Sequence, residues 1–167
     1  MPADISFAIN YFNEEKITNL IIMIIGIISI VFSLVFLFII KYSFFKGMAI
    51  PLLLIGMIQV TAGTIVYTRT AKDIIRIEEG FKTGITATKN SELIRMKKVD
   101  RNFVIYQWIE IALIFTGIIL YSIFYRSKLV FWKGLALGLI IQASVILMVD
   151  SASKKNAEHY MIFLNAI

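Results

Sequence analysis

A predominantly apolar run from Phe103 to Tyr125 constrains the fold of this chain more than any other part of the sequence. A helix of that length reaches about 34 Å, enough to cross a bilayer hydrocarbon core of about 30 Å. Three further apolar runs lie at residues 17–40, 47–68 and 134–153. Hydrophobic residues make up 59% of the chain, whereas soluble domains contain about 45–50%. The sequence therefore predicts an all-α integral membrane protein, a four-transmembrane-helix bundle in which residues 1–167 form one domain.

The one sizeable polar region, residues 69–102, begins with apolar side chains at helical spacing along one side. Gly80 and Gly84 are expected to break this helix. Asn90 or Ser91 is then expected to cap a new helix that continues into the third span. We therefore expect the second and third spans to extend past the membrane as a cytoplasmic helical hairpin, which we call the stalk.

Both ends of the chain are expected to be amphipathic. Residues 1–16 mix apolar and polar side chains, which favours an interfacial segment that leads into the first span. Residues 154–167 predict an amphipathic helix with Tyr160, Phe163 and Leu164 among its apolar residues. This helix could lie on the membrane surface or pack on the stalk, and the sequence does not decide between the two placements.

The distribution of Lys and Arg predicts the orientation in the membrane. Four spans put both termini and the stalk on one side, which carries 12 of the 17 basic residues. Cytoplasmic loops are the ones that carry an excess of Lys and Arg. We therefore expect both termini and the stalk in the cytoplasm, and we place the protein in a bacterial plasma (inner) membrane.

A short sequence similarity links the second and fourth spans. Residues 44–50 read FFKGMAI and residues 131–137 read FWKGLAL. An apolar run with a glutamine follows each motif, and the spacing to Gln59 and to Gln142 differs by four residues. One interpretation is a duplication that gives two tandem hairpins in parallel orientation. The other is that two helices after short turns draw on the same few residue types.

Glu110 and Asp150 are the carboxylates expected at membrane depth. Counted from the short turns, both lie about 24–26 Å along their helices, near the cytoplasmic edge of the hydrocarbon. An isolated charge is costly there, so each needs a proton or a partner, and Arg69 and Lys154 are the expected partners. The cluster is either an ion, proton or head-group site, or an ion-pair cluster that fixes the register of the helices.

Gln59 and Gln142 lie nearer the middle of their spans. They could line a polar path, although such residues more often bond from one helix to another. The candidate polar layer in the membrane therefore consists of Glu110, Asp150, Arg69, Gln59 and Gln142.

The sequence argues against several kinds of chemistry. The chain has no cysteine, which excludes disulfides, thiol redox chemistry and thiolate metal sites. Its one histidine, His159, excludes a bis-histidine haem, and we expect no metal and no cofactor. No nucleic-acid-binding motif accompanies the pI near 9.6, which we attribute to basic residues that flank the spans and face anionic lipid. We assign no catalytic residue.

Two classes of function fit these features. The first and favoured one is a non-enzymatic accessory or regulatory subunit that binds a protein partner through residues 69–102 and 154–167. The second is a small oligomeric transporter or channel built around the two carboxylates. A third, an enzyme that acts on lipids, would need several polar groups at one interface. A bundle without a polar, water-filled cavity would favour the subunit. A transporter or an enzyme would require a polar cavity among Gln59, Glu110, Gln142 and Asp150.

Overall fold

In the computed structural model, which describes residues 3–167, every regular element is an α-helix. Each of the four helices is long and apolar enough to cross a membrane. This confirms the predicted all-helical class with four long apolar helices. The helices are α1 (Ala3–Phe38), α2 (Ser43–Thr83), α3 (Ile85–Phe124) and α4 (Val130–Ala166).

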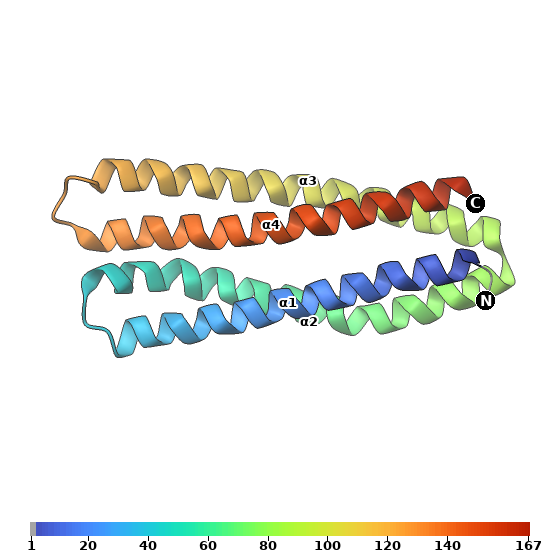
Figure 1. Cartoon of the computed structure of the whole chain (residues 1–167), viewed down its shortest axis with the longest axis horizontal. Coiled ribbons are helices and arrows are strands. Elements are labelled where there is room, and N and C mark those ends of the chain that lie inside the picture. The colour runs from blue at the N-terminus through green and yellow to red at the C-terminus, as the bar shows by residue number, and fades with distance from the viewer. Residues whose placement is uncertain (1–2) are drawn as a thin grey trace.

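The helices form two hairpins that lie side by side, as Figure 1 shows. One hairpin consists of α1 and α2, and the other of α3 and α4. α2 packs on both α1 and α4, whereas α3 packs mainly on α4. The two turns within the hairpins lie at one end of the bundle, which we call the short-turn end. Both termini and the turn at Gly84 lie at the other end, which we call the Gly84 end.

The turn between the hairpins is shorter than the sequence predicts. α2 runs on to Thr83 and α3 begins at Ile85, so Gly84 alone interrupts the helices and neither Asn90 nor Ser91 starts one. Gly80 remains inside α2 instead of breaking it. A Cβ atom at Gly80 would lie 2.7 Å from the hydroxyl oxygen of Thr88. The missing side chain of Gly80 therefore allows α2 and α3 to approach closely beside their turn.

At the Gly84 end all four helices share one buried core, because the first turns of α1 and the last turns of α4 pack beside the stalk. Residues 3–16 are helical and place Ile5, Ala8, Tyr11 and Phe12 in this core. Residues 154–166 continue α4 and pack on the stalk, the second of the two expected placements. Each segment has an apolar stripe at helical spacing, and these stripes cover one another. The core consists of Ile5, Ala8, Tyr11, Phe12, Ile77, Phe81, Met96, Ala157, Tyr160 and Leu164.

Stacked aromatic rings join α1 to α4 within this core. The rings of Tyr11 and Tyr160 are 4.2 Å apart and nearly parallel. Those of Phe7 and Phe163 are 4.6 Å apart. Aromatic pairs of this kind contribute about 0.5–1.5 kcal/mol each beyond the burial of their area. The rings therefore hold the first and last helices together at the Gly84 end.

At the short-turn end the hairpins meet through glycines. A Cβ atom at Gly47 would overlap the carbonyl oxygen of Phe131, and one at Gly134 would overlap the carbonyl oxygen of Phe44. These are equivalent positions of the two related motifs, so the motifs contact each other reciprocally across α2 and α4. Small residues are typical where helix backbones approach closely. The contact thus depends on glycine at both positions.

Candidate solute site between the hairpins

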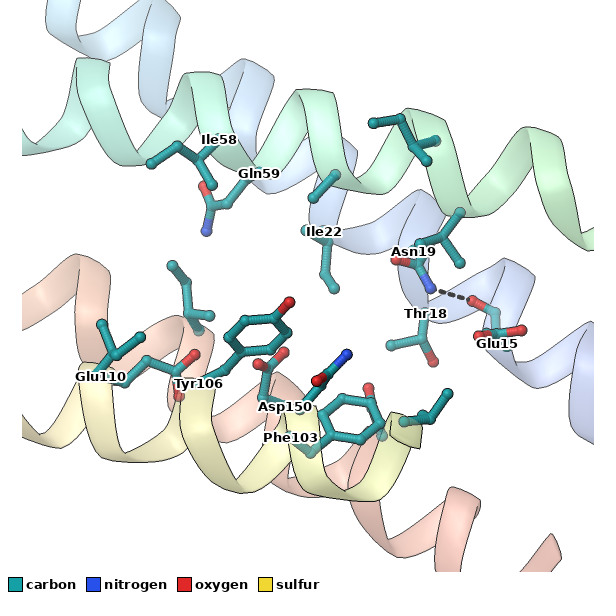
Figure 2. Close-up of a pocket in the computed structure, with 18 of the residues that line it drawn as sticks. Glu15, Thr18, Asn19, Ile22, Ile58, Gln59, Phe103, Tyr106, Glu110 and Asp150 are labelled. Carbon is teal, nitrogen blue, oxygen red and sulfur yellow. Dashed lines mark hydrogen bonds between the residues drawn. The ribbon is translucent and has the colours of Figure 1, made fainter. Parts of the chain in front are cut away.

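The two hairpins touch at both ends of the bundle and leave a partly open cavity of about 620 Å³ between the contacts. All four helices line it. Figure 2 shows Ile22 of α1 and Gln59 of α2 on one side of this space, and Tyr106, Glu110 and Asp150 of α3 and α4 on the other. The cavity lies between the glycine contact at the short-turn end and the aromatic core at the Gly84 end.

Helical periodicity brings the lining residues of α3 and α4 onto one face of each helix. α3 contributes Phe103, Tyr106, Glu110 and Leu113, whereas α4 contributes Ala143, Ile146, Asp150 and Ser153. The two sets have the same spacing, with steps of three, four and three residues, which keeps each set on one side of its helix. A carboxylate occupies the third position of both sets. The spacing therefore turns Glu110 and Asp150 toward the cavity from two neighbouring antiparallel helices.

The carboxyl groups of Glu110 and Asp150 lie within side-chain hydrogen-bond reach of each other. Glu110 is 5% exposed, and its Oε2 has no hydrogen-bond partner. Among the ion pairs of residues 3–167, none neutralises either carboxylate. A buried carboxylate oxygen without a donor is unusual and points to a proton, water or ligand that completes it.

Gln59 and Gln142 join α2 to α4 beside the cavity. The Nε2 of Gln142 donates to the Oε1 of Gln59 over 3.3 Å. Both side chains are buried, and of the two only Gln59 lines the cavity. The pair acts as a bond between hairpins, the commoner of the two roles considered from the sequence.

Arg69 lines the cavity but does not pair with Glu110 or Asp150, in contrast to the expectation from the sequence. Its guanidinium lies 3.4 Å from Glu15 of α1 and 3.0 Å from Asp73 of α2. Lys154, the other expected partner, lies 3.6 Å from Glu158. The physical reason is that α1 begins beside the stalk, so that Glu15 reaches Arg69 from the neighbouring helix.

The Arg69 contacts belong to a chain of ion pairs that crosses α1, α2 and α3. Asp73 also pairs with Arg76 at 3.2 Å, and Arg76 reaches Glu92 at 3.3 Å. Glu92 is 2% exposed and accepts two hydrogen bonds from Arg95, at 2.6 and 2.9 Å. Acidic and basic groups alternate along this chain. The wall of the cavity near Arg69 is therefore neutralised, whereas the wall at Glu110 and Asp150 is not.

Burial raises the pKa of Glu15, although the nearby guanidinium groups of Arg95 and Arg69 oppose the rise. Its Oε2 has no hydrogen-bond partner. Sequence analysis did not identify Glu15 as a cavity residue, because residues 1–16 were expected at the membrane surface. The spacing of Tyr11, Glu15, Thr18 and Ile22 along one helical face was the available signal.

Neither a metal cluster nor a similarity to other proteins identifies the site. Within residues 3–167 no group of three His, Cys, Asp or Glu side chains could hold a metal ion. No family model matches the chain, and no curated protein or solved structure is significantly similar to it. The cavity and its polar groups are therefore the basis for inferring a function.

Proposed function

We propose that this chain is an integral membrane protein that binds a small solute between its two hairpins and transports it across the membrane. The supporting observation is the cavity of about 620 Å³ that is lined by the buried Glu110, whose Oε2 has no hydrogen-bond partner. Ligand sites in proteins have volumes of about 300–1,000 Å³, with apolar walls and a few polar groups. Ionisable residues inside membrane spans are expensive and commonly mark substrate or ion pathways.

The placement in the membrane follows the distribution of apolar and basic residues. Large apolar side chains cover the outside of the helices, for example Ile28, Val31, Leu54, Phe115 and Ile119. The stalk and both termini lie together at the Gly84 end, where most Lys and Arg are found. We place this end in the cytoplasm of a bacterium and the helices in its plasma membrane.

The mechanism we propose uses the two hairpins as rigid bodies. They are joined at the short-turn end by the Gly47 and Gly134 contacts, and at the Gly84 end by the aromatic core. The solute occupies the space between these contacts. Loosening one contact while the other holds would open the cavity toward one side of the membrane at a time, as in transporters built from paired repeats.

Cysteine labelling tests whether water reaches the cavity. Because the natural chain has no cysteine, a single introduced thiol is the one reactive site. Ala62 lines the cavity, whereas Ala112 is exposed outside it. Counted from the helix ends at Ser43 and Phe124, Ala62 lies about 28 Å and Ala112 about 18 Å from the short-turn end, so both lie within the predicted spans. A membrane-impermeant thiol reagent is added to one side or the other of sealed membranes.

We expect Ala62→Cys to react from both sides and Ala112→Cys to react slowly from either. Equal reactivity of the two variants would contradict a water-filled cavity. Reaction of Ala62→Cys from one side alone would contradict transport, since a transporter exposes its site to both sides in turn.

A partner-binding subunit is the second candidate function, supported by apolar residues on the outside of the stalk and the tail. Ile75 is 57% exposed, Ile94 72% and Ile162 67%, and all three lie outside the predicted spans. Protein partners commonly cover such residues when they are clustered. A homo-oligomer would cover them equally well. If the subunit hypothesis holds, Ile94→Glu should abolish co-purification of a partner in mild detergent, while the exposed control Lys72→Glu should retain it.

A further inference from the structure

We infer that the solute bound between the hairpins is an amphipathic organic cation, whose positive head lies between Glu110 and Asp150 and whose apolar body fills the rest of the cavity. This inference rests on the proposed function and specifies the chemical class of its solute. It follows from the charge of the cavity wall, from the shape and lining of the cavity, and from the orientation of one buried carboxyl group.

The charge of the wall selects a cation. Three carboxylates line the cavity, Glu15, Glu110 and Asp150, and Arg69 is the one basic residue that does so among the residues that the structure describes. Arg69 pairs with Glu15 and with Asp73, so its charge is already balanced. An anion at Glu110 and Asp150 would meet two acidic groups with no basic residue to offset them, which is strongly unfavourable where the local dielectric is low.

The position of Glu110 indicates where the charge of the solute would lie. Glu110 is 5% exposed, its side chain lines the cavity, and its Oε2 has no hydrogen-bond partner. The carboxyl of Asp150 lies beside it. A cationic head between the two carboxyl groups would supply the missing partner and replace the proton that two neighbouring carboxyl groups must otherwise share.

The rest of the lining selects an apolar body. Apolar side chains of all four helices line the wall, among them Ile22, Ile55, Ile58, Ile109, Leu113 and Ile146. Rings of Phe103 and Tyr106 line the wall of α3 near Glu110, and an aromatic face attracts an organic cation. A bare metal ion would leave most of 620 Å³ unfilled, and it would find two carboxylates where Ca²⁺ takes six to eight oxygen ligands.

Tetraphenylphosphonium and tetraphenylborate provide the test, because the two ions share their size and shape and differ in the sign of their charge. Binding of each ion to the purified protein in mild detergent is measured at matched free concentrations. The variants are Glu110→Gln and Asp150→Asn, which keep the shape of each side chain and remove its charge. The control is Glu78→Gln, which removes a carboxylate that pairs with Lys82 on the stalk, outside the cavity.

We expect the parent protein and Glu78→Gln to bind tetraphenylphosphonium, and to bind tetraphenylborate at least about tenfold more weakly. Glu110→Gln and Asp150→Asn should each lose about tenfold or more in affinity for the cation, as expected when one partner of a buried charge pair is removed. Equal binding of both ions by the parent protein would overturn the inference. Unchanged affinity for the cation in Glu110→Gln would also overturn it.

Protection of Ala62→Cys keeps the test informative if the carboxyl variants do not fold, because this variant retains both carboxylates. Tetraphenylphosphonium should slow its thiol labelling and tetraphenylborate should not. Labelling that neither ion slows, or that the anion slows as much, would contradict a cation site while leaving a water-filled cavity intact. A thiol that never reacts would instead contradict the proposed function itself, so the two failures are distinguishable.

Discussion

The side-chain amide of Gln142 donates a hydrogen bond to that of Gln59 across the two hairpins, with 3.3 Å between nitrogen and oxygen. Both side chains are almost fully buried, at 3% and 4% exposed. The bond joins α4 to α2 at the cavity, where Gln59 is part of the wall. It therefore links the packing of the two hairpins directly to the shape of the candidate site.

A double-mutant cycle on this pair measures how strongly it couples the hairpins. Gln59→Ala and Gln142→Ala should each destabilise the protein, and the double variant should lose less than the sum of the two. Hydrogen bonds between membrane helices couple by about 0.6 kcal/mol on average and up to about 1.7 kcal/mol. SDS-induced unfolding from mild detergent measures the free energies. Strict additivity would mean that the amides do not act as a pair, and Thr61→Ala, whose hydroxyl bonds to the backbone of its own helix, provides an exposed control.

Substitution of Gly134 by alanine should disrupt the contact at the short-turn end. A Cβ atom there would overlap the carbonyl oxygen of Phe44, which cannot move without shifting α2. Overpacking typically costs about 1–3 kcal/mol, and a backbone obstacle favours the upper part of that range. SDS-induced unfolding should show the loss directly.

Gly84→Ala provides the matched control for that substitution. A Cβ atom at Gly84 meets nothing within 4 Å, and its φ of −175° is open to any residue. We expect a change within about 0.5 kcal/mol. Equal losses in Gly84→Ala and Gly134→Ala would show that the close approach of α2 and α4 does not limit stability.

Glu92 should be the most sensitive carboxylate of the stalk. It is 2% exposed and pairs with both Arg95 and Arg76. Glu92→Gln leaves the guanidinium of Arg95 buried without its charge partner, and breaking a buried pair in this way costs about 3–5 kcal/mol. Glu78→Gln, which removes a pair on the surface, should cost no more than about 1 kcal/mol. Unfolding midpoints in mild detergent would compare the two, and similar losses would contradict a structural role for the buried pair.

The apolar pattern predicted the four long helices because a helix of 20 or more apolar residues has few alternatives to a lipid environment. Counting residues from the short turns also gave Glu110 and Asp150 a common level, and the structure brings their carboxyl groups together. Such a count works because the rise per residue is constant along each helix.

Tertiary packing decided what the sequence pattern could not. Arg69 pairs with Glu15 because α1 starts beside the stalk, and the local pattern of residues 1–16 fits a membrane surface equally well. The hairpins contact each other at both ends of the bundle. The cavity is the space that these contacts leave between them. Those contacts join residues as distant in sequence as Tyr11 and Tyr160, so no local pattern reveals the cavity.

Glu15 should make the stability of the protein depend on pH in a predictable direction. Burial raises the pKa of its carboxyl in the folded protein above the ordinary value of 4.5. A group with a raised folded pKa stabilises the fold when it is protonated. That contribution is complete below pH 4.5 and is lost as the pH rises through the folded pKa. Glu15→Gln cannot ionise, so it should lack this loss.

The measurement is the difference in unfolding free energy between Glu15→Gln and the parent protein across that pH window. The variant lacks the Glu15–Arg69 ion pair only at pH values where Glu15 of the parent is ionised, and Asp73 still holds that guanidinium at 3.0 Å. The constant part of the difference therefore reports the change of side chain, and the slope reports the ionisation of Glu15, including its pair with Arg69. We expect the variant to gain on the parent as the pH increases. A difference that is flat, or that moves toward the parent, would contradict the raised pKa.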